Sequence, residues 1–267
     1  MKLVRYGNPG KEKPGLIDAN GKLRDLSGVI KDIGPDQLSD AALAKLAKLK
    51  TDKLPLVKGS PRYGSPITGT RKFIAIGLNY ADHAAESGLP IPAEPVVFMK
   101  ATSCIQGPND PIMLPKNSVK TDWEVELGVI IGKQARYVSQ KEALNHVAGY
   151  CTINDVSERE FQIERGGTWD KGKGCDTFGP LGPWLVTRDE VPNPQKTVHV
   201  AGSQRQTRAE RQHQDHDLQR RQNHQLREPV HDPGTRRRDH HRHATRCGPG
   251  HEAACFPEEG RHDVAGD

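Results

Sequence analysis

The clearest pattern along the chain is an alternation of apolar and acidic residues just before a run of apolar residues at positions 127–131. Trp123 and Val125 alternate with Glu124 and Glu126. A period of two is typical of a β-strand, and it places Glu124 and Glu126 on the same face. The pattern therefore predicts a strand through this segment that carries two carboxylates on one side.

The residues at the start of the chain predict a small N-terminal domain. Residues 1–6 have the pattern of a strand, and residues 18–21 are typical of a hairpin turn. Residues 40–49 repeat Ala and Leu between lysines, which predicts a short helix that begins near Asp40. We therefore expect an α+β domain over residues 1–57.

A second folded part follows after a linker. Residues 58–70 are rich in Gly, Ser and Pro, which favours a linker. Residues 72–77 are mostly apolar and predict a buried strand, and a helix is expected from about residue 81 to residue 87. The larger domain is expected to cover residues 71–195.

The composition changes abruptly at Lys196. The segment 196–267 has no Ile, Met, Trp or Tyr, and it holds ten of the twelve His of the chain. It also holds twelve Arg but no Lys beyond Lys196. Such a segment cannot bury enough apolar surface to offset its loss of conformational entropy on ordering. The composition predicts a disordered tail.

The genetic code offers a reason for this tail. Histidine codons read one base later begin with AT or AC, so each tail histidine would become Ile, Met or Thr. One allowed translation of the tail in that frame includes T-M-I-F-N-V-A-K-I-I-S-Y-V and T-G-T-P-P-G-V-G, which have the composition of a folded core. We therefore hypothesise a single-base frameshift near Lys196, in the gene or in its sequencing. The chain translated in the shifted frame is called the frame-restored chain below.

Charge and length exclude several classes of protein. The 267 residues allow one large domain or two, and the net charge of +5 is too small to indicate a nucleic-acid partner. The N-terminus is too polar for a signal peptide, and no apolar run is long enough to span a membrane. The five Cys form no C-x-x-C pair. These features predict a cytoplasmic protein.

The two carboxylates of Glu124 and Glu126 indicate a metal site. Two like charges on one face of an apolar strand need a cation, a proton or open water. Asp155 ends a second apolar run and is a candidate third ligand. Mg²⁺ takes oxygen ligands, and carboxylates are its usual protein partners. The alternative is that these carboxylates lie on a solvated strand face.

Other candidate residues have ordinary alternatives. His83 and Glu86 share a helix face and could form a general-base pair, or an exposed i,i+3 pair. Lys100, at a strand end, and Lys173, in a glycine-rich loop, could bind an anionic substrate or simply be solvated. Two more polar side chains follow Asp155 on a predicted helix and point to one side: Arg159 and Gln162. The spacing of His240, His241, His243 and Cys247 is similar to that of metal ligands, but in a frameshifted tail it would be an accident.

These segments together resemble the fumarylacetoacetate hydrolase family. The resemblance covers residues 70–190, and the order and spacing of its motifs are specific. The matching positions are 76–83, 98–100, 124–129, 154–157 with 159 and 162, and 173–176 with 178–180.

The resemblance implies a mixed β fold with α-helices, built on a rolled β-sheet catalytic domain. It implies Mg²⁺ or Mn²⁺ as the cofactor and a small oxo-acid as the substrate. Residues of this chain match the family's metal ligands (Glu124, Glu126 and Asp155), its water-activating pair (His83 and Glu86), its active-site lysine (Lys173) and its substrate contacts (Arg159 and Gln162). Lys100 is a further candidate for substrate binding.

The implied activity is hydrolysis of a C–C bond in an acylpyruvate-type or fumarylacetoacetate-type acid. A hydroxymuconate-type isomerase or decarboxylase and a ureidoglycolate lyase are the alternative enzymes. The family also has a T-G-T-P-P-G-V-G-like segment near its substrate, and here that segment exists only in the shifted frame. An inactive, misfolded product is therefore a further alternative, and a homodimer is expected only of the frame-restored chain.

Overall fold

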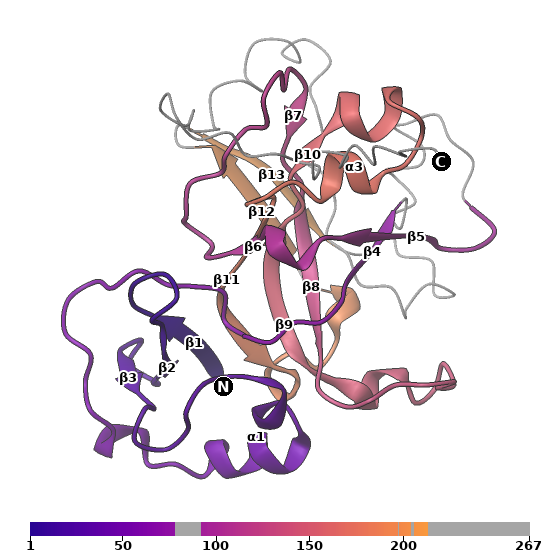
Figure 1. Ribbon diagram of the computed structural model, residues 1–267. Helices are drawn as coiled ribbons and strands as arrows, with labels where there is room; N and C mark the ends of the chain where they lie inside the picture. Colours follow the sequence, from indigo (N-terminus) through magenta and orange to yellow (C-terminus); the bar gives the residue numbers. More distant parts are fainter. Residues whose placement is uncertain (78–91, 197, 204–205, 213–267) are drawn as a thin grey trace, which may run out of the picture.

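The computed structural model describes residues 1–77, 92–196, 198–203 and 206–212 (Figure 1). These residues form a seven-stranded sheet with the order β3-β2-β1-β11-β9-β8, in which β6 also pairs with β11. The β6–β11 pair is parallel, and the other pairs of this sheet are antiparallel. Its strands are β1 (Lys2–Tyr6), β2 (Lys13–Ile17), β3 (Leu23–Asp25), β6 (Ile105–Gln106), β8 (Val125–Ile131), β9 (Val147–Asn154) and β11 (Gly179–Thr187).

The strand predicted from the alternation of acidic and apolar residues is confirmed as β8. It pairs with β9 from Val125 opposite Asn154 to Ile131 opposite Val147. The two strands form a hairpin, so the start of β8 and the end of β9 lie side by side. Residues just outside this end of the hairpin, Glu124 and Asp155, are therefore neighbours.

The N-terminal predictions are confirmed for the individual elements. β2 and β3 form a hairpin, and the Asp18 carboxylate accepts hydrogen bonds from the backbone N–H groups of Asn20 and Lys22 in its turn. Helix α1 spans Asp40–Ala47, and the Ser39 hydroxyl caps its N-terminus by accepting from Ala42 N. Ser at this position satisfies a backbone donor that the helix leaves open.

The N-terminal strands nevertheless continue the large sheet. β1 pairs with β11, with Leu3 opposite Leu185. The start of β1 is also joined to the end of β11 by a backbone hydrogen bond of 2.9 Å from Thr187 N to Met1 O. The proposed boundary at 57–70 stays a prediction, but strand pairing crosses between the parts of the chain that it would separate.

One apolar core lies between the sheet and the elements that follow β3. It is formed by buried side chains from both halves of the described chain: Leu3, Leu16, Leu26, Ile33, Leu38, Leu46, Ile130, Ala148, Cys151, Ile153, Leu181 and Leu185. Full burial of a Leu or Ile side chain stabilises a fold by about 1.5–3 kcal/mol. This shared core ties the N-terminal strands to β8, β9 and β11.

The strand predicted at residues 72–77 is confirmed as β4 (Phe73–Gly77), which pairs with β5 (Val96–Lys100). Its predicted burial is wrong for most of the strand, because Ala75 is buried whereas Ile74 is 52% exposed. Side chains of β5 alternate between two faces. Phe98 and Lys100 are buried, whereas Val97 and Met99 are 61% and 41% exposed. β5 therefore carries one charged residue, Lys100, into the interior of the protein.

Short elements frame the end of the β8–β9 hairpin (Figure 1). β7 (Thr121–Asp122) pairs with β10 (Ser157–Glu158). The predicted helix after Asp155 is a π-helical turn at Glu160–Glu164, and helix α3 spans Asp170–Lys173. Single turns of 3₁₀-helix lie at Pro35–Gln37, Thr51–Lys53, Thr102–Cys104, Ala143–His146, Arg188–Glu190 and Pro194–Lys196.

The largely disordered tail expected from residue 196 stays a prediction, but its first part contains two described strands. β12 (Val198–Ser203) pairs with β13 (Gln206–Gln212) as an antiparallel hairpin. A hairpin forms its backbone hydrogen bonds between residues close in sequence, so composition alone does not forbid it. The remaining tail residues, 213–267, lie outside the described residues.

The fold class is confirmed as a mixed one dominated by antiparallel strands, whereas its rolled closure stays a prediction. Within the described ranges, no helix is both long and apolar enough to cross a lipid bilayer.

Candidate metal and substrate site

Two buried carboxylates meet at one lysine where β8 begins and β9 ends. Lys173 Nζ lies 2.6 Å from Glu124 Oε2 and 2.9 Å from Asp155 Oδ2. Glu124 is 4% exposed, Asp155 5% and Lys173 3%. The two acids therefore converge on one positive charge in the interior.

Hairpin geometry brings these acids together. Asp155 follows the last residue of β9, and its backbone N donates to Glu124 O over 2.8 Å. Ser157, which is fully buried, donates its hydroxyl to Glu124 Oε1 over 3.2 Å. Glu124 therefore has contacts through both of its carboxylate oxygens.

Lys173 is positioned by a close approach of helix α3 to the turn after β10. A Cβ atom added at Gly172 would lie 2.4 Å from Glu158 O and 2.6 Å from Gln162 N. Only a glycine lets the two segments approach this closely. The ammonium group of Lys173 also lies 5.3 Å from the centre of the Phe98 ring, a cation–π distance.

Burial and charge act in opposite directions on Lys173. Burial disfavours the charged ammonium and lowers its pKa, but the neighbouring carboxylates of Asp155 and Glu124 favour the charge. The carboxylates prevail, so the pKa of Lys173 lies above its ordinary value. Lys173 is therefore a fixed cation in this arrangement.

Lys100 is held at the same place by three acceptors. Its Nζ donates to Asp155 Oδ1 over 2.5 Å, to Val156 O over 3.2 Å and to Lys173 O. A lysine has three donors, and these contacts use all of them. Substrate binding by Lys100 stays a prediction, and in this structure Lys100 holds Asp155.

Arg159 lies on the other side of Glu124. Its Nη2 is 2.7 Å from Glu124 Oε1 and 2.8 Å from Asp122 Oδ2. Its Nη1 donates to Gln162 Oε1 over 3.2 Å. The structure therefore brings the two predicted substrate contacts, Arg159 and Gln162, to the carboxylate pair.

Glu126 is buried, with 7% of its surface exposed, and lies in β8 two residues after Glu124. Among the residues that the structure describes, no group of three His, Cys, Asp or Glu side chains is arranged to hold a metal ion. The chemistry of the donor set nevertheless fits a hard divalent cation, because two buried carboxylates already converge on a positive charge.

Two predicted site residues cannot be placed. His83 and Glu86 lie outside the described residues, so their role as a general-base pair stays a prediction. The structure also brings to the site three residues that were not among the predicted site residues, namely Asp122, Ser157 and Glu158. Asp122 could have been found from the same period of two that identified Glu124 and Glu126.

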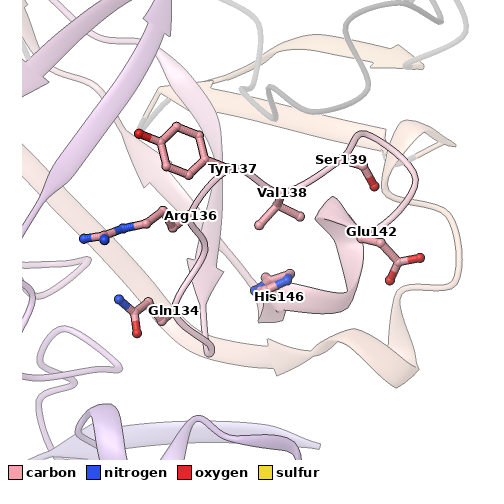
Figure 2. Close-up of a pocket in the computed structure, with 7 residues that line it drawn as sticks. All are labelled: Gln134, Arg136, Tyr137, Val138, Ser139, Glu142 and His146. Atoms are coloured by element: carbon pink, nitrogen blue, oxygen red, sulfur yellow. The ribbon is translucent and has the colours of Figure 1, made fainter.

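A separate open cavity of about 700 Å³ lies at the opposite end of the β8–β9 hairpin. Figure 2 shows the residues that line it, on the loop between the two strands: Gln134, Arg136, Tyr137, Val138, Ser139, Glu142 and His146. A seven-residue strand is roughly 20 Å long, so this cavity is remote from the carboxylates. It does not take part in the candidate site.

The amino-acid sequence matches known proteins through the same region. The family described by the C-terminal part of fumarylacetoacetate hydrolase matches residues 72–228. A protein of Burkholderia multivorans, named only in general terms as a hydrolase, is 66% identical over 195 residues. This match covers 73% of this chain and 69% of that protein.

Solved structures show the same fold. Fumarylacetoacetate hydrolase from Exiguobacterium antarcticum has a TM-score of 0.66 and 29% identity, covering 81% of this chain and 76% of that chain. Maleylpyruvate hydrolase from Sphingobium sp. SYK-6, in complex with manganese(II) and pyruvate, has a TM-score of 0.65 and 23% identity, covering 83% and 80%. The match over residues 72–228 and the relative that is 66% identical show that the chain belongs to the fumarylacetoacetate hydrolase family.

Proposed function

We propose that the frame-restored chain is a divalent-metal-dependent hydrolase that cleaves a C–C bond in a small acylpyruvate-type acid. The observation that carries the proposal is the convergence of buried Glu124 and Asp155 on one cationic centre. A buried carboxylate is costly unless a cation is paired with it. Two such acids at one point are typical of a site built to hold positive charge.

Glu124, Glu126 and Asp155 would hold Mg²⁺ or Mn²⁺. When bound, such an ion supplies a Lewis acid that polarises the oxygen atoms of a chelating oxo-acid. The maleylpyruvate hydrolase of similar fold binds manganese(II) together with pyruvate, which supports this cofactor class.

Cations beside the carboxylates suit an acidic substrate. Arg159 presents a planar guanidinium group, whose geometry matches a carboxylate. Gln162 is buried next to it and fixes its Nη1. We propose that Arg159 and Gln162 bind the substrate's carboxylate, and that Lys173 stabilises negative charge that develops on the substrate oxygen. Lys100 would maintain Asp155 in position.

The proton transfers are assigned to His83 and Glu86. A histidine whose imidazole is oriented by a carboxylate can remove a proton from water at neutral pH. The activated water would attack the carbonyl carbon that is not part of the pyruvyl group. Cleavage of the adjacent C–C bond would leave a carboxylic acid and, after protonation, pyruvate.

The proposal is tested by incubating the frame-restored chain with acetopyruvate, a small acylpyruvate, in the presence of Mg²⁺. We expect equal amounts of acetate and pyruvate to form, and we expect EDTA to stop the reaction until Mg²⁺ is added in excess. Product analysis by NMR distinguishes hydrolysis from isomerisation, which would consume the substrate without forming acetate. Pyruvate formation that continues at full rate in EDTA would contradict the metal requirement.

A further inference from the structure

Asp122 is joined to the carboxylate pair through Arg159. Arg159 Nη2 lies between Asp122 Oδ2, at 2.8 Å, and Glu124 Oε1, at 2.7 Å. Arg159 Nε donates a second hydrogen bond to the same Asp122 oxygen over 3.2 Å. Two contacts from one guanidinium to one carboxylate fix the plane of the group as well as its position.

The backbone that carries Asp122 is itself anchored. Asp122 pairs with Ser157 in the β7–β10 ladder, and Thr121 pairs with Glu158. Glu158 is fully buried, and its carboxylate accepts hydrogen bonds from Thr121 Oγ1 over 2.8 Å and Lys120 N over 3.0 Å. Because Arg159 follows Glu158 directly, Glu158 holds both ends of the Asp122–Arg159 contact.

The contacts of Glu124 show what this arrangement controls. Glu124 Oε1 contacts Arg159, while Oε2 contacts Lys173. Without the Asp122 carboxylate, the guanidinium of Arg159 could turn toward Glu124 and Gln162. It would then no longer face the side from which a substrate would approach. Asp122 keeps Arg159 stretched between two carboxylates.

We propose that Asp122 is a positioning residue, which orients Arg159 for the carboxylate of the substrate, with Glu158 as its backbone anchor. The inference rests on the proposed function, because it gives Arg159 an acidic ligand. The contact that is lost is a charge-assisted hydrogen bond, so removing the charge of Asp122 should weaken binding of the ligand about tenfold.

The test uses oxalate, a planar dianion with two adjacent carboxylates, as the probe. Titration calorimetry measures oxalate binding to the Mn²⁺-loaded protein, and electron paramagnetic resonance measures Mn²⁺ binding separately. Both are measured on the full 267-residue chain and, in parallel, on the frame-restored chain. The variants are Asp122→Asn, Asp122→Glu and, as a matched control at an exposed acid, Asp36→Asn.

We expect Asp122→Asn to weaken oxalate binding about tenfold while Mn²⁺ affinity and melting temperature change little, because Asp122 acts through Arg159. Asp122→Glu should restore part of the affinity, and Asp36→Asn should have no effect. A purely structural role would lower the melting temperature and weaken both ligands together, and that result would overturn the inference.

A double-mutant cycle covers the case in which Asp122→Asn perturbs folding. In an Arg159→Ala background, Asp122→Asn should cause no further loss of oxalate affinity, since the residue it orients is gone. A further tenfold loss there would overturn the inference.

Unchanged oxalate affinity in Asp122→Asn would overturn the inference about Asp122 but not the proposed function. Absence of oxalate binding in both parent chains would instead overturn the proposed function, and the inference with it. If only the frame-restored chain binds, the same comparisons are made there.

Discussion

Lys100 Nζ lies 2.5 Å from Asp155 Oδ1, and these side chains are only 1% and 7% exposed. The opposite oxygen of Asp155 contacts Lys173 at 2.9 Å. Asp155 is therefore held between two ammonium groups that come from different elements, β5 and α3. This arrangement explains why a lysine at the end of β5 is buried although nothing in its local sequence predicts burial.

Replacing Lys100 should destabilise the protein strongly. Lys100→Met removes one partner of a buried ion pair, and such a loss typically costs about 3–5 kcal/mol. Urea unfolding of the frame-restored chain, followed by tryptophan fluorescence, measures the free energy of unfolding. Lys58→Met, at an exposed lysine, serves as the control. Equal stabilities of the two variants would show that the Lys100–Asp155 pair contributes nothing.

Metal binding should depend on Glu126. The frame-restored chain is expected to bind Mg²⁺ or Mn²⁺, and Glu126→Ala should abolish this binding because it removes one of three proposed oxygen ligands. Calorimetry with MnCl₂ measures the affinity of both proteins. Glu142→Ala, at an exposed glutamate far from the site, is the control. An unchanged affinity in Glu126→Ala would reject Glu126 as a ligand.

Turnover should depend on His83. If His83 and Glu86 transfer protons, His83→Ala in the frame-restored chain should lower the turnover number by about 10²–10⁴-fold. Metal affinity should hardly change, because neither residue is a proposed ligand. Near-normal turnover of acetopyruvate would instead return His83 and Glu86 to the role of an exposed surface pair.

Acid should remove the stabilisation that Asp110 provides. Arg62 donates to Asp110 Oδ1 over 2.6 Å, and this contact lowers the pKa of Asp110 below its usual value. A carboxylate whose pKa is lower in the folded state stabilises the fold above its unfolded-state pKa, about 3.9, and loses this effect as the pH falls through the folded-state pKa.

Asp110→Asn in the frame-restored chain should therefore lower the melting temperature at pH 7, and the difference from the parent should shrink as the pH falls below about 4. Thermal unfolding between pH 7 and pH 2 measures this difference in melting temperature, with Asp36→Asn as the exposed control. A difference that stays constant down to pH 2 would mean that the charge of Asp110 does not contribute.

The 267-residue chain with its printed tail, called the written chain here, should be inactive and prone to aggregation. Ile74, Val97 and Met99 lie on one face of the β4–β5 ribbon and are 52%, 61% and 41% exposed. Exposed apolar patches favour association, and the written tail has few apolar residues with which to cover them. Restoring the frame should recover solubility and turnover together.

Sedimentation and an acetopyruvate assay on the written and frame-restored chains measure both properties. A written chain that is soluble, unfolds cooperatively and cleaves acetopyruvate would show the tail to be a genuine structural element. Sequencing of the DNA across the codons for Gln195 and Lys196 tests the frameshift directly.

Local patterns in the sequence were sufficient for the local elements. The alternation around Glu124 and Glu126 predicted β8, and the repeat of Ala and Leu after Asp40 predicted α1. Each of these signals lies within the element itself, because side chains repeat every two residues along a strand and about every 3.6 residues along a helix. Strand patterns also identified the two acids that the hairpin brings together, Glu124 and Asp155.

Contacts between distant segments could not be predicted in this way. No local pattern states that Lys100 will reach Asp155, or that Arg159 will bridge Asp122 and Glu124. Such contacts depend on how separate elements pack, and a lone lysine is usually solvated. The hairpin formed by β12 and β13 was missed for a related reason, because composition describes a segment's ability to form a core and not its ability to pair with itself.

The pairing of β1 with β11 has a consequence for how the protein forms on the ribosome. Leu3 must wait for Leu185 to emerge before this pair can close, so the sheet depends on a contact of very long sequence separation. Yet β11 ends at Thr187, before the change in composition at Lys196. Every strand of the seven-stranded sheet has therefore been synthesised before the ribosome reaches that point. A single-base shift there would spare the sheet and the carboxylates of its β8–β9 hairpin, and would change only what is added to them afterwards.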